Sequence, residues 1–453
     1  MPRRNIAWSV LIVVVSLVCY QKVPANRYGR VLAGVLDRVG RDYYLPIQDL
    51  DLFEGAMRGM AGQLDENSIY VAPAKKQSFE EDINKQFEGI GINVWIDPKT
   101  NQLTVISPLL GTPAYEAKIR AGDRILKIDD QSTQGMTVDD ARRRLRGKAG
   151  TSVTLLILHE GETQPTEKTL ARRIIQVDTV WGDTRNPDGT WNYFLPGPGK
   201  AGRGRIAYVR VTAFADAEKS DESGGKAKST VTDLRDVLED LTRQGMRGLV
   251  LDLRDDRGGS LQAAVEMCDL FLSAGEIVTV RSREGRVGRA YYASGKAPFT
   301  GFPMAILVND RTASASEIVA ACLQDHHRAV IVGQQSYGKG TVQQLMDLGQ
   351  AGTLKLTVAT YWRPSGRNIH RNRGEEEPGA TWGVLPDEGY EVVLDKEEFA
   401  RFLRWRQDRD MPPGTTRSVV AASHPPGDES AKPFVDRALA KAVEYLAGRE
   451  SRE

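Results

Sequence analysis

From residue 205 onward, short apolar runs alternate with segments of helical periodicity. The apolar runs are rich in Val, Ile, Leu and Ala and occupy residues 206–211, 248–253, 304–308 and 329–332. The helical segments between them occupy residues 230–243, 261–272 and 316–324. Strands with little polar alternation are typical of sheets buried on both faces, and strand–helix alternation favours parallel pairing. The second half of the chain is therefore predicted to be an α/β domain.

Length and charge limit the other possibilities. The chain has 453 residues, which is too long for one core and indicates two to four domains. Its 61 basic and 60 acidic residues give a net charge of +1, which offers no field for a polyanion, so nucleic-acid binding is not expected. The three cysteines form no CxxC or Cys/His cluster, so no metal site or disulfide framework is predicted. Cys268 and Cys322 lie in apolar helical patterns and are predicted core residues.

The N-terminus has the pattern of a targeting segment. Arg3 and Arg4 precede an apolar run at residues 6–20, as in a secretory signal or a short signal anchor. The cleavage site is poor, and the leading positive charges favour an orientation with everything after Lys22 outside the cytoplasm. Residues 1–25 are therefore predicted to be a signal anchor or signal peptide. The expected location is extracytoplasmic, in a bacterial periplasm or cell envelope, with attachment to the membrane.

Residues 26–83 follow with apolar side chains at helical spacing between residues 28 and 64. This pattern predicts an N-terminal helical region that serves packing or dimerisation. A homo-oligomer is therefore left open.

The helical pattern gives way to short strand-like runs from Gly89-Ile90-Gly91-Ile92 onward. Strand-like runs follow at residues 103–106, 124–128, 153–158 and 170–175, with helical patterns at residues 113–119 and 138–145. Together with the Ala-Gly-Asp turn at residues 121–123, this resembles a PDZ domain over residues 84–176. In that family a Gly-rich loop offers backbone N–H groups to a peptide's terminal carboxylate. The resemblance implies that Gly89, Ile90, Gly91 and Ile92 bind exposed apolar C-termini of proteins or peptides.

Two short segments of the α/β half carry the candidate chemistry. Ser314 lies directly before an apolar helical run, and Lys339 lies between two glycines. A serine becomes a useful nucleophile when a base lies beside it. A lysine amine acts as a base where burial lowers its pKa from the ordinary value of about 10.4. Gln343 could hydrogen-bond that amine, and the Ala315 N–H at the start of a helix suits a developing oxyanion.

Each segment also has a plainer interpretation. Ser314 with Glu317 three residues later matches a helix capping box, the more frequent meaning of that local pattern. Residues 333–339 nearly match a phosphate-binding loop, but Gly340 stands where the Mg²⁺-binding hydroxyl is needed. No G-x-S-x-G nucleophile elbow is present in the sequence. A Ser-His-Asp triad would have to draw its histidine from the five in the chain, His159, His326, His327, His370 and His424.

The order and spacing of three motifs resemble the C-terminal processing peptidases, also called tail-specific proteases. The motifs are DLRDDRGG at residues 252–259, TASASE at 312–317 and GKGTVQ at 338–343. Residues 361–367 and 383–387 look like two further landmarks of that family. The resemblance implies an α+β multidomain fold with an N-terminal helical segment, a PDZ domain and an α/β, ClpP/crotonase-like peptidase domain at residues 177–395. A C-terminal helical tail would occupy residues 396–453.

Carried over residue by residue, the resemblance makes Ser314 the nucleophile, Lys339 the general base and Gln343 the residue that orients the lysine. Ala315 and Gly259 match the positions whose N–H groups form the oxyanion hole. No metal or other cofactor is implied.

The chain departs from the family pattern in two places. Asp256-Arg257 replaces the usual Asn-Pro before the paired glycines, and an insertion occupies residues 372–381. Neither changes Ser314 or Lys339. The predicted function is an extracytoplasmic serine endopeptidase that binds C-termini through its PDZ domain and cleaves through an acyl-enzyme. The alternative is a non-enzymatic PDZ scaffold with a degenerate peptidase domain.

Overall fold

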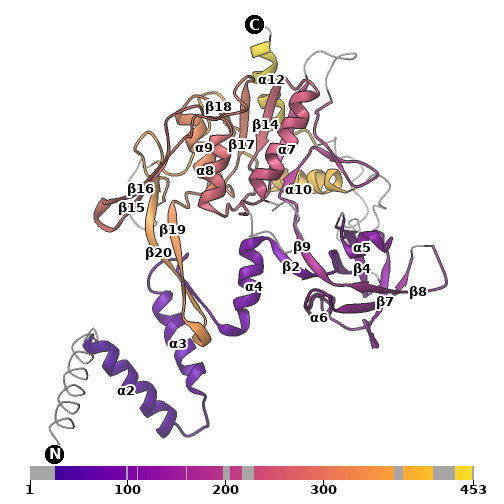
Figure 1. Ribbon diagram of the computed structural model, residues 1–453, viewed down its shortest axis with the longest axis vertical. Coiled ribbons are helices and arrows are strands. Elements are labelled where there is room, and N and C mark those ends of the chain that lie inside the picture. Colours follow the sequence, from indigo (N-terminus) through magenta and orange to yellow (C-terminus); the bar gives the residue numbers. More distant parts are fainter. Residues whose placement is uncertain are drawn as a thin grey trace, which may run out of the picture. The chain divides into compact units, whose positions relative to one another are not determined.

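A computed structural model describes residues 26–97, 100–109, 111–159, 161–196, 205–216, 229–371, 381–411 and 434–450 (Figure 1). The predicted anchor at residues 1–25 and most of the predicted insertion, residues 372–380, lie outside these ranges. The chain divides into two compact units. One comprises the chain up to residue 77 together with residues 343–357, and the other comprises residues 78–342 and 358–453.

The first unit contains the predicted N-terminal helices. The stretch expected to be helical from residue 28 to residue 64 is two helices, α2 (Arg27–Asp42) and α3 (Asp49–Ala61). A short strand, β1 (Ile69–Val71), then pairs antiparallel with the first part of β20 (Thr353–Trp362), and Tyr70 lies opposite Leu354. The preceding strand, β19 (Thr341–Asp347), also pairs with β20. This β-structure was not predicted.

In the second unit, the region predicted to be a PDZ domain has strands at three of the four predicted runs, residues 103–106, 124–128 and 153–158, and a helix at each of the two predicted positions. Its antiparallel sheet has the order β3 (Ile92–Asp97), β4 (Gln102–Pro108), β5 (Arg124–Ile128), β7 (Ser152–Leu158) and β8 (Thr166–Ala171). Two short helices accompany it, α5 (Pro113–Glu116) and α6 (Val138–Leu145). Alternate residues of β7 (Val153, Leu155 and Ile157) are buried, as expected for a sheet with one face on the core. The run predicted at residues 170–175 is split, because β9 (Arg173–Gln176) pairs with β2 (Gln86–Gly89) in a separate ribbon.

The α/β half of the chain is built on a five-stranded sheet. Its order is β10 (Val180–Trp181), β13 (Ile206–Val211), β14 (Gly248–Asp252), β17 (Met304–Val308) and β18 (Ala329–Gly333). The last four strands are parallel, and only the short β10 is antiparallel to its neighbour β13. Three helices, α7 (Thr230–Arg243), α8 (Leu261–Asp269) and α9 (Ala315–Asp325), lie side by side across the sheet (Figure 1).

Two hydrophobic cores explain why the strands lack polar alternation. Val209, Leu251 and Ile306 pack in one core with α7, α8 and α9. The intervening strand residues pack in a second core with α12 (Arg437–Glu450). Because both faces are covered, every residue of β14, β17 and β18 is buried. The predicted α/β fold is confirmed, and Cys268 and Cys322 lie in the first core as expected.

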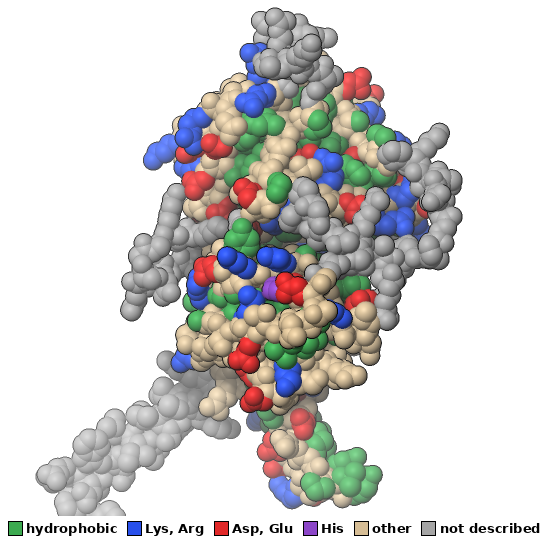
Figure 2. Space-filling view, turned by 90° about the vertical axis from the view of Figure 1, so that its right-hand side faces the viewer, with side chains coloured by type: hydrophobic (Ala, Val, Ile, Leu, Met, Phe, Trp, Pro, Cys, Tyr) green, Lys and Arg blue, Asp and Glu red, His purple; other side chains and the backbone are tan. Residues whose placement is uncertain are grey.

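The surface agrees with the balanced charge of the sequence. On the face drawn in Figure 2, basic and acidic side chains are interspersed over the described residues. Within the described ranges, none of the helices combines the length and the apolar character that crossing a bilayer demands.

Candidate active site

Ser314 occupies a strained backbone position at the start of α9. Its φ of 60° and ψ of −119° lie where a residue with a side chain is rarely found. The helix begins directly afterwards, since the Ile318 N–H donates to the Ser314 carbonyl at 3.0 Å. Such strain persists only when surrounding structure enforces it, and it is frequent at functional sites. The Ser314 residue is 8% exposed, so it is largely buried but still accessible to solvent.

One buried carboxylate brings Ser314 and Lys339 together. Glu317 Oε2 accepts hydrogen bonds from the Ser314 N–H and the Lys339 N–H, both at 2.8 Å. The same carboxylate accepts from the Gly338 N–H at 2.6 Å and from the Ser336 hydroxyl at 2.5 Å through Oε1. The backbones of the serine and lysine segments are therefore no more than two hydrogen-bond lengths apart. The two motifs, far apart in sequence, meet in space.

Glu317 is completely buried, and this burial raises its pKa to about 7, although all four donors act to lower it. The Ser314–Glu317 bond is also one half of the predicted capping box. Capping and catalysis are thus compatible interpretations of Ser314, because the residue that caps the helix also holds the lysine segment.

The lysine segment is tightly enclosed by other parts of the domain. A side chain on Gly340 would lie 2.2 Å from the His370 backbone nitrogen, and one on Gly338 would lie 2.5 Å from the Trp382 ring. The Gly340 carbonyl also accepts a hydrogen bond from the Tyr361 N–H at 2.7 Å. Lys339 itself is half-buried. The two flanking glycines therefore allow the close approach that the sequence predicts.

Gln343 lies in β19, where its side-chain amide donates to the Thr357 hydroxyl at 3.1 Å. Both residues belong to the first unit. The role of Gln343 in orienting Lys339 stays a prediction.

One predicted oxyanion donor, the Gly259 N–H, belongs to a glycine turn, and the other, the Ala315 N–H, lies beside that turn. Gly258 and Gly259 both have positive φ, 86° and 154°. A side chain on Gly258 would lie 2.7 Å from the Ala315 nitrogen and 2.8 Å from Ser314 Cβ. Gly259 forms a β-bridge with Phe214 and is exposed. Among the described residues, neither the Ala315 N–H nor the Gly259 N–H donates to a protein acceptor, so both donors are available to a substrate oxygen.

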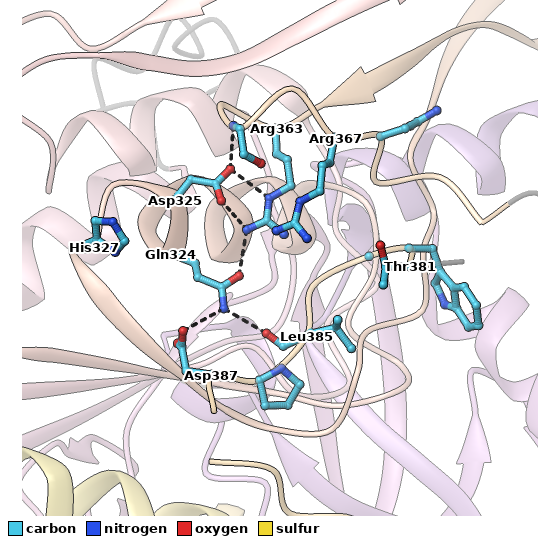
Figure 3. A pocket seen from close by; sticks show the side chains of 13 residues that line it. Gln324, Asp325, His327, Arg363, Arg367, Thr381, Leu385 and Asp387 are labelled. Carbon is cyan, nitrogen blue, oxygen red and sulfur yellow. Dashed lines mark hydrogen bonds and ion pairs between the residues drawn. The ribbon is translucent and has the colours of Figure 1, made fainter. Parts of the chain in front are cut away.

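The two landmark segments hold the far end of α9. Arg363 donates to both oxygens of Asp325, at 2.6 and 2.9 Å, and to the Gln324 side chain at 2.8 Å (Figure 3). Gln324 in turn donates to the Leu385 carbonyl and to Asp387. Burial acts to raise the pKa of Asp325, but the bonds from Arg363 hold it below its ordinary value. A cavity of about 420 Å³ lies beside this network.

The PDZ residues line a groove of about 480 Å³. Its walls include Gly89, Ile90, Gly91 and Ile92 from the predicted loop, and Val138, Arg142, Leu145 and Arg146 from α6 and the residue after it. Among the described strands, β3 pairs only with β4, so its other edge is open toward an added strand. The Ile90 N–H and the Gly91 N–H have no protein acceptor within the described ranges.

Comparisons with known proteins show which family the chain resembles. Residues 205–388 match the family described as peptidase family S41, and residues 104–158 match a PDZ domain. The chain is 34% identical over 387 residues to the carboxy-terminal-processing protease of Bartonella bacilliformis, covering 85% of this chain and 82% of that one. It is 32% identical to the carboxy-terminal processing protease CtpA of Bacillus subtilis, covering 80% and 70%. A solved photosystem II D1 C-terminal processing protease is 25% identical, with coverage of 79% and 86% and a TM-score of 0.42.

The chain belongs to the carboxy-terminal processing proteases of peptidase family S41. It is therefore a serine-type peptidase with a PDZ domain, as its motifs predict. Two histidines of the protease have partners elsewhere in the described structure: His159 bonds to Asp123 in the PDZ domain, and His326 bonds to the Glu276 carbonyl.

Sequence reasoning missed two residues of the protease's site. Glu317 was seen only as a capping residue, because three of its four donors come from residues 336–339, which have no local relation to it. Asp256 was noted only as a departure from the family pattern. It is completely buried, and its Oδ1 accepts the Gly258 N–H at 2.8 Å.

Proposed function

We propose that this protease cleaves protein tails through a Ser314–Lys339 dyad and an acyl-enzyme. The observation that carries the proposal is the shared Glu317 oxygen, which fixes the serine and lysine backbones next to each other. The proposal assigns a nucleophile, a base and a pair of donors for the oxyanion to residues around the N-terminal end of α9.

The reaction begins when Ser314 Oγ attacks the scissile carbonyl carbon and Lys339 Nζ takes the hydroxyl proton. The carbonyl oxygen becomes an oxyanion and accepts hydrogen bonds from the Ala315 and Gly259 N–H groups. When the C–N bond breaks, the Lys339 ammonium gives its proton to the leaving amine. Lys339 then takes a proton from water, which attacks the ester and restores Ser314. Gln343 is the residue we assign to orient the lysine.

The PDZ groove supplies the substrate. An unstructured tail would add as a strand along β3, with its terminal carboxylate at the N–H groups of Ile90 and Gly91. The apolar side chains of Val138 and Leu145 suit an apolar last residue, and the Arg142 and Arg146 guanidinium groups suit the carboxylate charge. The substrates would therefore be proteins or peptides with exposed apolar C-termini.

We also propose that the protease works outside the cytoplasm and is held at the membrane by its first residues. The support is the sequence pattern alone, with Arg3 and Arg4 before the apolar run.

The test uses a substrate that carries an apolar tail. Ser314→Ala and Lys339→Ala should each reduce cleavage to background while the thermal unfolding of the protein is unchanged. Ser273→Ala and Lys296→Ala, both at exposed positions, are matched controls that should cleave normally. Near-normal turnover by folded Lys339→Ala would show that the dyad is wrong.

A further inference from the structure

The turn that carries the Gly259 N–H is fastened to the serine segment by one residue, Asp256. Its carbonyl accepts the Ala313 N–H at 2.9 Å and the Ser316 hydroxyl at 3.2 Å, one bond on each side of Ser314. Its side-chain Oδ1 accepts the Gly258 N–H at 2.8 Å. Asp256 therefore links the nucleophile's segment to the turn that forms half of the proposed oxyanion hole.

The other carboxyl oxygen has no partner. Asp256 is completely buried, and Oδ2 makes no hydrogen bond among the described residues. A buried carboxylate that is neither paired nor fully hydrogen-bonded is very costly, so such a group keeps its proton instead. Burial raises the pKa of Asp256 to about 8, which the Gly258 N–H, the Ser316 hydroxyl and the Lys85 ammonium only partly oppose.

Nearby charged groups are engaged with other partners. Arg254 bonds to Asp252 and Asp436, and Glu317 holds its four donors. Other residues near the turn interact with each other: Arg311 forms an ion pair with Asp255, and the Ser260 hydroxyl donates to Asp216. The Arg257 side chain is exposed. Among the described residues, Lys85 is thus the one cation whose charge acts on the pKa of the Asp256 carboxyl.

We propose that Asp256 is a positioning residue that holds the oxyanion turn as a neutral carboxylic acid, so that its ionisation switches the protease off at alkaline pH. The neutral acid has nearly the shape of the asparagine that the family pattern places here, and it keeps one oxygen free to accept the Gly258 N–H. Loss of its proton would place a negative charge directly behind the turn where the substrate oxygen becomes negative. That charge disfavours the transition state and leaves substrate binding in the PDZ groove unaffected.

This inference rests on the proposed function, in which the Gly259 N–H stabilises the oxyanion. The dyad requires a neutral lysine, so activity should rise with pH before it falls. Wild-type kcat is therefore expected to be bell-shaped, with an alkaline fall near pH 8.

The experiment compares kcat and KM for a tail-bearing peptide across the pH range in wild type and in Asp256→Asn. The variant should lose the alkaline fall, so that its kcat above pH 9 exceeds that of wild type by about tenfold or more, with KM unchanged. Asp255→Asn is the matched control, because its side chain faces Arg311 instead of the turn, and it should keep the wild-type profile.

Two further measurements keep the outcomes separate. Circular dichroism at each pH shows whether the protein is folded, and infrared spectroscopy detects a protonated carboxyl that Asp256→Asn removes. An alkaline fall that persists in Asp256→Asn, or the absence of that infrared band, would overturn the inference. Turnover by Ser314→Ala would instead overturn the proposed function, whatever the pH profile of Asp256→Asn.

Discussion

Glu317→Gln tests whether the buried carboxylate holds the dyad together. Glutamine has the same shape, but one of its two oxygens is replaced by an NH₂ group. With the NH₂ group at the Oε2 position, the Ser314 and Lys339 N–H groups face another donor. With it at the Oε1 position, the Gly338 N–H faces another donor, while the Ser336 hydroxyl can turn and accept. The change should therefore separate the serine and lysine segments or loosen the loop behind the lysine.

The energies decide how the variant should behave. A hydrogen bond to a charged group contributes about 1.5–3 kcal/mol, so the loss of one or two bonds costs roughly 1.5–6 kcal/mol. Burial of the charge opposes this, because a pKa raised from 4.5 to about 7 corresponds to roughly 3 kcal/mol of relief when the group becomes neutral. The net loss of unfolding free energy should be at most about 3 kcal/mol, which a domain of ordinary stability survives. Misplacement of the dyad by about 1 Å costs about 100-fold in rate.

The assay measures kcat and KM at about pH 8.5, where Glu317 is ionised in wild type. We expect kcat to fall about 100-fold or more, while KM stays the same because the PDZ groove is untouched. Glu444→Gln, at an exposed position of α12, is the control and should match wild type. A folded Glu317→Gln protein with wild-type kcat would refute the reasoning.

Two other predictions concern the groove and the stability of the fold. Arg142→Glu should raise KM for a tail-bearing peptide several-fold and leave kcat for a short peptide unchanged, because the groove would then repel the terminal carboxylate; equal effects on both substrates would contradict this. The pKa of Asp256 is raised from 3.8 unfolded to about 8 folded, so the folded state binds more protons between these values. Its contribution to stability is present below about pH 4 and is lost as the pH rises through about 8. The melting temperature of wild type should therefore fall more between about pH 6 and pH 9 than that of Asp256→Asn, and parallel curves in a calorimeter would argue against the raised pKa.

The sequence predicts best the elements whose burial can be seen locally. β13 and β17 have the predicted bounds because nearly all their residues are apolar. α6 also has its predicted bounds, and the Thr137 hydroxyl caps its N-terminus. The hairpin of β15 (Glu276–Ser282) and β16 (Val287–Tyr292) was not predicted. β16 is largely exposed, so no buried face marks it in the sequence.

Long-range polar contacts are equally hidden from local reasoning. The helix α10 (Lys396–Asp410) has little apolar periodicity and is held by pairs such as Asp410 with Arg210, 200 residues away. The same holds for Glu317, whose partners Ser336 to Lys339 are recognisable only once the fold is known. The serine and lysine of the proposed dyad could be predicted from motifs, but the Glu317 contacts that hold their segments together could not.

The most direct test of the central claim is covalent labelling of the resting enzyme by a fluorophosphonate, followed by peptide mapping. The account predicts one label per chain, on Ser314, at a rate that falls to background in Lys339→Ala and substantially in Glu317→Gln. A label on another residue, or undiminished labelling of Ser314 in folded Lys339→Ala, would contradict it.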